Sequence, residues 1–202
     1  MLRVDAPLET DRLLLRPFRD DDVDALHDLR TRADVLRYLY WPPATIEQTR
    51  DVVAQRLTMN TLSGENDSLV LAVEQRATGR MIGEVDLRWL SVEHRQGEVG
   101  AILHPAAQGR GFATETVSAL LDLAFDRLGL HRVTAQTNAH NAASIRALHR
   151  LGMRQEAHLR QCVHYAGTWH DELVFAILAE EWASRAPAGE GTGPAGAARC
   201  PS

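Results

Sequence analysis

One stretch constrains the fold of this chain more than any other. Between residues 97 and 128 an apolar run, a glycine-rich turn and a long amphipathic segment follow one another. Residues 97–104 (GEVGAILH) are typical of a strand, which Pro105 ends. From residue 112 to 128 apolar side chains recur with the i, i+3, i+4 spacing of a helix, and Gly129 follows. A strand that enters a helix through a tight turn predicts a sheet with helices packed on it.

The rest of the chain continues this mixture of patterns. Alternating or continuous apolar runs predict further strands, and helical spacing predicts further helices. The expected strands are residues 12–18, 68–75, 81–89, 132–137, 154–165 and 169–178, and the expected helices are residues 23–32, 46–62 and 141–151. The order β-α-α-β-β-β-α-β-α-β-β predicts a mixed α/β domain with one layer of sheet.

Two of the expected helices begin with polar signals. Thr45, with Gln48 three residues later, forms the pattern of a capping box for the helix over residues 46–62. The acidic run from Asp20 to Asp22 is expected to supply N-cap and first-turn carboxylates to the helix over residues 23–32, where they would complement its dipole.

Composition limits the possible classes of function. The chain has 202 residues, of which 45% are hydrophobic, enough for one domain with a buried core. The net charge of −5 argues against a general nucleic-acid binder, and no apolar run approaches the roughly 20 residues that span a membrane. Cys162 and Cys200 are not expected to form a structural disulfide, and no signal peptide is evident, so we expect a reducing cytoplasm. We expect one domain over residues 1–185 and a disordered tail rich in Ala, Gly and Pro over residues 186–202.

The glycine-rich turn has two interpretations. Gly109 and Gly111 permit a positive φ and a close approach of a ligand to the backbone, and Arg110 adds a guanidinium suited to phosphate. The start of the following helix offers unpaired N–H groups and the positive end of its dipole. The turn therefore either cradles a pyrophosphate or simply starts the helix. Two nucleotide motifs are excluded, because the chain contains no lysine for a Walker loop and Thr114 occupies the third small position of the dinucleotide fingerprint.

The spacing Gln108-x-x-Gly111-x-Ala113 resembles the acyl-CoA motif of the GNAT superfamily of N-acetyltransferases. Other ordered stretches are similar to the same family: residues 10–17, 97–105, 141–153 and 167–171, with Glu181-Trp182 near the end. Together they cover roughly residues 8–182. Within the superfamily the chain resembles the RimJ/RimL type, which acetylates protein N-termini among other amines.

The resemblance implies a fold and a reaction. The implied fold is a central, twisted, mostly antiparallel sheet of about seven strands with helices on both faces. One pair of parallel strands, residues 97–104 and 132–138, would splay apart to admit the pantetheine arm. The implied reaction is direct transfer of an acetyl group from acetyl-CoA to an amine, without a metal and without a covalent acyl-enzyme. The acceptor would be a protein N-terminus or a small molecule, and the resemblance is compatible with a homodimer through the last strands.

The resemblance also assigns residues to the acetyl-CoA site. Backbone groups of Ile102, Leu103 and His104 would pair with the pantetheine, and one N–H would hold the thioester carbonyl. The pyrophosphate and the rest of the CoA would be held by Gln108, Gly109, Arg110, Gly111, Phe112, Ala113, Thr114, Asn138, Asn141 and Ser144.

Two catalytic roles follow from the same resemblance. Glu98 is the first choice for the base that takes the proton of the amine, with Glu84 and Asp86 as second choices on the neighbouring strand. Many family members carry a tyrosine seven residues after the helix-opening Asn, where this chain has Leu148, so Ser144 is the candidate donor to the leaving thiolate. The alternatives are an ordinary solvated or ion-paired carboxylate for Glu98 and a first-turn serine without a catalytic role.

The acceptor site is the least determined part of the sequence. Tyr38, Tyr40 and Trp41 are expected to line it together with Glu84 and Asp86, although the aromatic residues could equally pack on the sheet. Cys162 is expected to be a small buried residue rather than a nucleophile. Two other functions remain open at this point: a non-catalytic acyl-CoA-binding module, and an acyltransferase that uses another donor such as succinyl-CoA.

Overall fold

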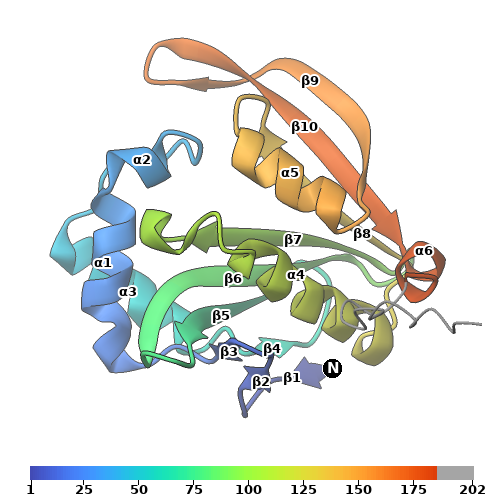
Figure 1. Cartoon of the computed structure of the whole chain (residues 1–202), viewed down its shortest axis with the longest axis horizontal. Helices are drawn as coiled ribbons and strands as arrows, with labels where there is room; N and C mark the ends of the chain where they lie inside the picture. Colours follow the sequence, from blue (N-terminus) through green and yellow to red (C-terminus); the bar gives the residue numbers. More distant parts are fainter. Residues whose placement is uncertain (186–202) are drawn as a thin grey trace, which may run out of the picture.

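The chain folds around one extended, mostly antiparallel sheet (Figure 1). The computed structural model describes residues 1–185, so the expected tail lies outside the described residues. The sheet has eight strands in the order β2-β3-β5-β6-β7-β8-β10-β9. Their bounds are β2 Leu8–Glu9, β3 Leu13–Arg16, β5 Ser68–Gln75, β6 Arg80–Ser91, β7 Gln96–Leu103, β8 Arg132–Asn138, β9 Arg154–Tyr165 and β10 Thr168–Leu178. The expected mixed α/β architecture with a mostly antiparallel sheet is confirmed, and the short edge strand β2 brings the count one above the expected seven.

Helices cover both faces of this sheet. The helical elements are η1 Asp20–Asp22, α1 Val23–Thr31, α2 Ala33–Leu36, α3 Ile46–Arg56, η2 Pro105–Ala107, α4 Phe112–Asp122, the π-helical turn η3 Leu123–Arg127, α5 Ala142–Arg150 and α6 Ala179–Ala183. The main core packs α4 and α5 on one face, with buried side chains such as Leu71, Val85 and Phe112. A smaller core packs α1 and α3 on the opposite face, around Leu26, Val53 and Val70. These two layers fix where a ligand can reach the sheet.

The strands β7 and β8 form the parallel pair and then part. Their pairing covers Gln96 with Arg132, Gly97 with Val133 and Glu98 with Thr134, and extends no further. Every other neighbouring pair in the eight-stranded sheet is antiparallel. The carboxyl halves of β7 and β8 therefore diverge, which confirms the splayed pair expected from the family resemblance.

The second expected helix is shorter than its sequence pattern suggested. α3 ends at Arg56 rather than at residue 62, because Thr61–Leu62 forms the strand β4 that pairs with β1, Leu2–Arg3. Its start agrees with the expectation: the Thr45 side chain accepts from the N–H of Gln48, and the Gln48 side chain accepts from the N–H of Thr45. The capping box is thus confirmed.

The acidic run before α1 has a different role from the one expected. Asp20–Asp22 forms a turn of 3-10 helix, and the Asp22 side chain makes no cap bond to α1. Its carboxylate instead accepts two hydrogen bonds from Arg16, at 2.8 and 2.7 Å, and both residues are buried. Arg16 also donates to Glu74 at 2.7 Å. Asp22 therefore belongs to a buried ion-pair network, which keeps the pKa of Arg16 above its usual value through the bonds to Asp22 and Glu74.

Candidate active site

The described part of the chain contains a cleft of about 430 Å³ at the carboxyl halves of β7 and β8. α4 and α5 line it from one face of the sheet, and α2 with the link after it lines it from the other. The expected site residues that line it are Tyr38, Ile102, Leu103, Gln108, Gly109, Gly111, Phe112, Ala113, Thr114, Asn141 and Ser144. The cleft thus offers one approach from each face of the sheet.

The glycine turn presents a row of free backbone donors at the start of α4. Gly109 and Gly111 have φ of 73° and 81°, so both occupy the left-handed region that glycine allows. Within residues 1–185, no acceptor in the chain pairs with the N–H of any residue from Gly109 to Thr114, and the first helical bond runs from Glu115 to the carbonyl of Gly111. Consecutive free N–H groups at a helix N-terminus favour an anion. This turn therefore fits a pyrophosphate.

Side chains before the turn fix its position. Gln108 donates from Nε2 to the carbonyl of Leu103 at 3.2 Å, which ties the turn to the end of β7. The His104 ring accepts from the N–H of Ala106 at 3.1 Å and lies 2.9 Å from Asp28 on α1. His104 thus anchors the turn, and its side chain is not among those that line the cleft.

The backbone of β7 offers alternate groups to the gap between the splayed strands. The N–H of His104 donates to the carbonyl of Ile82 on β6 at 2.8 Å. Because the backbone groups of a strand alternate between its two neighbours, those of Ile102 point to β6 as well, while those of Ala101 and Leu103 point toward β8. Of the three residues expected to pair with pantetheine, Leu103 alone is oriented to do so, and Ala101 joins it.

The beginning of α5 faces the cleft across from the turn. Asn141 caps the helix by accepting from the N–H of Ser144 at 3.2 Å, and both residues line the cleft. Ser144 is half-buried, so its hydroxyl can reach a ligand in the cleft. Leu148, at the position where many relatives carry tyrosine, is buried and lines the same cleft. Ser144 therefore lines the cleft, and its role as a donor to a thiolate stays a prediction.

Glu98 lies where the parallel strands part. It is the last residue of β7 that pairs with β8, and its carboxylate accepts a hydrogen bond from Gln136 Nε2 at 3.2 Å. Gln136 lines the cleft, whereas Glu98 itself does not. The carboxylate is thus one hydrogen-bonded side chain away from the cleft, and it can exchange a proton with a ligand there through water.

Asp86 and Glu172 share the sheet face of Glu98. Asp86 on β6 lies opposite Gly100 on β7. A Cβ at residue 100 would stand only 2.6 Å from Oδ1 of Asp86, so glycine leaves room for this carboxylate. Burial, together with the carboxylates of Glu84 and Glu98, raises the pKa of Asp86 to about 6. Burial and Glu98 also raise the pKa of Glu172. The three residues Asp86, Glu98 and Glu172 form what we call the acidic strip, across β6, β7 and β10.

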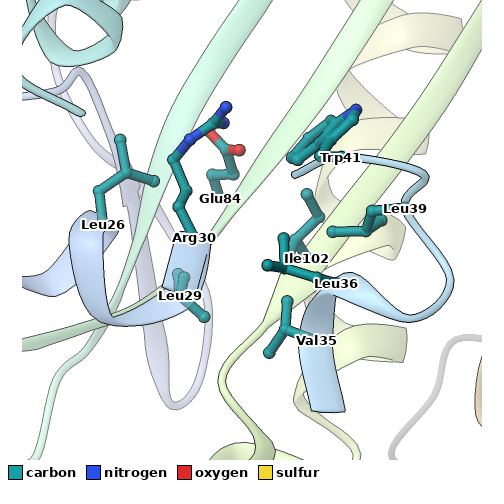
Figure 2. Close-up of a pocket in the computed structure, with 9 residues that line it drawn as sticks. All are labelled: Leu26, Leu29, Arg30, Val35, Leu36, Leu39, Trp41, Glu84 and Ile102. Carbon is teal, nitrogen blue, oxygen red and sulfur yellow. The ribbon is translucent and has the colours of Figure 1, made fainter. Parts of the chain in front are cut away.

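Glu84 is directed away from the cleft into a small cavity of about 10 Å³ under α1 and α2 (Figure 2). The side chain is only 5% exposed, and its carboxylate lies 3.4 Å from Arg56 Nε. Figure 2 shows the Arg30 guanidinium beside this carboxylate, and Trp41 stacks on Arg30 at 4.8 Å. Burial lowers the pKa of Arg30. Glu84 and Trp41, both expected at the acceptor site, thus belong to a buried charged cluster that fixes the helices on the sheet.

The aromatic link after α2 is divided between two places. Tyr38 lines the cleft. Tyr40 instead crosses to the far strands: its hydroxyl accepts from Asn138 Nδ2 at 2.8 Å, and its ring lies 5.1 Å from that of His170. Asn138 is buried, and its Oδ1 accepts from the N–H of His140. Asn138 therefore fastens the link to β8 instead of lining the cleft.

The remaining expected residues lie at the surface. Arg110 is exposed and stacks on Phe112 at 4.8 Å. Cys162, expected to be buried, is exposed on β9, because this outer strand has few side chains packed against it. That expectation was wrong.

Several residues at the site were not predicted from the sequence. Gln136 and Glu172 join Glu98 only through strand pairing, which the sequence does not specify. Arg37, Arg146 and Arg150 also line the cleft. The helical spacing of Arg146 and Arg150 does place them on one side of α5, and this pattern could have identified them.

Within residues 1–185, no group of three or more His, Cys, Asp or Glu side chains is arranged to hold a metal ion. None of the helices in this part of the chain is both long and apolar enough to cross a membrane.

The fold and the cleft define an acyl-CoA-dependent acyltransferase. The family model "Acetyltransferase (GNAT) domain" matches residues 12–154, and the chain belongs to this family of N-acetyltransferases. It is 32% identical to the uncharacterized N-acetyltransferase YoaA of Bacillus subtilis over 171 residues, which cover 85% of this chain and 96% of the relative.

Solved structures agree with this assignment. A GNAT-family acetyltransferase from Bacillus anthracis superposes with a TM-score of 0.76 at 28% identity, over 87% of this chain and all of the other. The fold is also shared with a spermidine N-acetyltransferase from Vibrio cholerae in complex with CoA and spermine, with a TM-score of 0.74 at 23% identity over 87% of this chain and 100% of that one. Acetyl-CoA is the co-substrate of the family, whereas the RimJ/RimL type stays a prediction.

Proposed function

We propose that the chain transfers the acetyl group of acetyl-CoA to the amine of a small, positively charged molecule. The observation that carries this proposal is the acidic strip beside a cleft whose other side fits a pyrophosphate. Carboxylates on one face and free N–H groups on the other favour a cationic acceptor and an anionic donor. A fold neighbour is described in complex with CoA and spermine, a small polyamine, which supports the same choice.

The donor would be held by three parts of the chain. The N–H groups from Gly109 to Thr114 would hold the pyrophosphate, and the gap-facing backbone of Ala101 and Leu103 would align the pantetheine. One of these N–H groups would stabilise the negative charge that develops on the thioester oxygen. Acetyl-CoA supplies an activated acyl group whose leaving group is a thiolate. Ser144 would donate a hydrogen bond to that sulfur.

The acceptor would enter from the side of the acidic strip. At neutral pH its ammonium must lose a proton before the nitrogen can attack, and Glu98 would accept that proton directly or through water held by Gln136. Asp86, with a pKa of about 6, would help to bind the cation and remains the second candidate for the base. Arg88 shares this face, but its guanidinium turns to Asn66 at 3.3 Å. Arg56 and Arg88 act to lower the pKa of Asp86, but burial together with Glu84 and Glu98 outweighs them.

Thiol release from acetyl-CoA tests this proposal with three kinds of acceptor. They are a short aliphatic diamine, a monoamine of equal length with a neutral end, and a peptide with a free N-terminus. We expect the diamine to have the highest kcat/KM. Glu98→Gln should reduce its kcat, while Asp86→Asn should mainly raise its KM. Equal kcat/KM for the diamine and the neutral monoamine would refute the cationic acceptor. A higher kcat/KM for the peptide would favour a protein N-terminus as the acceptor. CoA binding without turnover of any amine would favour a non-catalytic module.

A further inference from the structure

Arg12 lies outside the cleft, yet its side chain reaches the glycine turn. It follows the turn between β2 and β3 and ion-pairs with Glu115 in the first turn of α4, with Nε and Nη2 at 2.7 and 2.6 Å from Oε2. The other oxygen of Glu115 accepts from the N–H of Arg12 at 2.9 Å and from Thr10 Oγ1 at 2.6 Å. Although burial acts to raise it, these bonds keep the pKa of Glu115 below its usual value. The carboxylate is therefore ionised and fully occupied.

A third contact of Arg12 fixes one peptide of the turn itself. Nη1 donates to the carbonyl of Arg110 at 2.9 Å, and the guanidinium stacks on the ring of Phe112 at 4.6 Å. In a trans peptide the C=O and the following N–H point in opposite directions. Because Arg12 holds the carbonyl of Arg110 on its own side, the N–H of Gly111 is directed away from Arg12.

The turn needs such a restraint because of its glycines. The peptide between Arg110 and Gly111 adjoins Gly111, and Gly109 lies one residue before it; both glycines adopt positive φ. Glycine populates both signs of φ with little cost, so this peptide can rotate more freely than others. A rotated peptide would present a carbonyl oxygen to the phosphates in place of an N–H group. Removal of Arg12 would also leave the negative charge of Glu115 unbalanced, in the first turn of the helix that would hold the pyrophosphate.

We propose that Arg12 is a positioning residue for CoA, which holds the Arg110–Gly111 peptide in its donor orientation and neutralises Glu115 beside the pyrophosphate site. Arg12 is not among the residues that line the cleft. This proposal rests on the part of the proposed function that places the pyrophosphate at the turn, and it requires no knowledge of the acceptor.

The test compares Arg12→Gln with Arg76→Gln as a matched control. Arg76 also contacts the turn between β2 and β3, donating to the carbonyl of Thr10 at 2.8 Å, but makes no contact with the glycine turn. The first readout is the Kd of CoA by calorimetry, which needs no turnover. The second is the ratio of kcat/KM for acetyl-CoA to kcat/KM for S-acetyl-pantetheine, which lacks the pyrophosphate.

We expect Arg12→Gln to weaken CoA binding by about ten- to a hundredfold, as the loss of hydrogen bonds to a charged group implies. The donor ratio should fall by a similar factor, with kcat for S-acetyl-pantetheine unchanged. Arg76→Gln should change neither quantity more than about twofold. An unchanged Kd in folded Arg12→Gln protein, or an equal loss with both donors, would overturn the proposal. If the wild-type protein bound CoA but released no thiol with any amine, the proposed acetyl transfer would be refuted. The Kd of CoA for Arg12→Gln would still test the role of Arg12.

The double variant Arg12→Gln/Glu115→Gln separates the two effects of Arg12. If the peptide orientation dominates, the double variant binds CoA as weakly as Arg12→Gln does. Full recovery of affinity in the double variant would show that charge balance alone matters, and would overturn the role of the Arg110 carbonyl. Thermal unfolding of all variants identifies any that fail to fold, and Arg12→Lys, which keeps the charge but loses the paired geometry, should recover only part of the affinity.

Discussion

Replacing Gly111 by alanine tests whether the left-handed backbone of the turn is required for CoA binding. At φ of 81° an L-residue costs about 1–2 kcal/mol relative to glycine. The new Cβ would also stand 3.4 Å from Arg12 Nη2, a side chain whose other contacts leave it little freedom to move. The substitution therefore strains the turn through its backbone, whereas the contact with Arg12 has an ordinary van der Waals length.

The strain must appear either in stability or in affinity. If the turn keeps its conformation, the free energy of unfolding falls by about 1–2 kcal/mol. If the turn relaxes, CoA must restore it on binding, and the Kd rises by about five- to thirtyfold. Urea unfolding and calorimetric titration with CoA measure both quantities on the same preparation.

Two other glycines serve as controls. Gly109→Ala introduces the same kind of strain at φ of 73°, and its Cβ meets no atom within 4 Å, so it should cost about as much as Gly111→Ala. Gly64 lies in open space without a positive φ, and Gly64→Ala should change stability by less than about 0.5 kcal/mol. The reasoning is refuted if Gly111→Ala matches Gly64→Ala in both CoA affinity and urea midpoint.

Three further predictions concern catalysis, pH and the core. Ser144→Ala should lower kcat without changing the Kd of CoA, and an unchanged rate would remove Ser144 from the mechanism. Between the ordinary Asp value of 3.8 and the pKa of about 6 the folded state binds the extra proton on Asp86, so the free energy of unfolding should fall as pH rises through this window. This fall amounts to at most about 2–3 kcal/mol, and Asp86→Asn should abolish it. Urea unfolding at several pH values measures it, and the same dependence of the unfolding free energy on pH in Asp86→Asn would contradict the prediction. Arg16→Met should destabilise the protein by about 3–5 kcal/mol, because Asp22 and Glu74 lose their partner, and a loss below 1 kcal/mol would contradict that ion-pair network.

Local patterns predicted much of the fold. The strand Ser68–Gln75 has the expected bounds, and the helix after the glycine turn begins at the expected Phe112. Periodicity identifies such elements because each buries one continuous set of side chains. The end of α3 was missed, since Thr61–Leu62 is a strand only through its pairing with β1.

The candidate site likewise contains residues that are contiguous in the sequence and residues that only strand pairing brings together. The turn from Gln108 to Thr114 is contiguous, so its residues offered an anion site as one of two interpretations, and the family resemblance favoured that one. The acidic strip depends on which strands pair and in which register, and Glu172 enters it only through the pairing of β10 with β8. The role of Asp22 depends on a buried arginine six residues earlier, and that of Arg12 on a carboxylate 103 residues later. Long-range charge pairs of this kind leave no periodic trace in a sequence.

A crystal structure of the protein with CoA tests the central claim most directly. The account predicts pyrophosphate oxygens at hydrogen-bond distance, about 3 Å, from N–H groups between Gly109 and Thr114. It also predicts the pantetheine in the gap between β7 and β8, with its sulfur near Ser144. Phosphates bound elsewhere on the molecule, or a pantetheine that avoids the gap between the splayed strands, would contradict it.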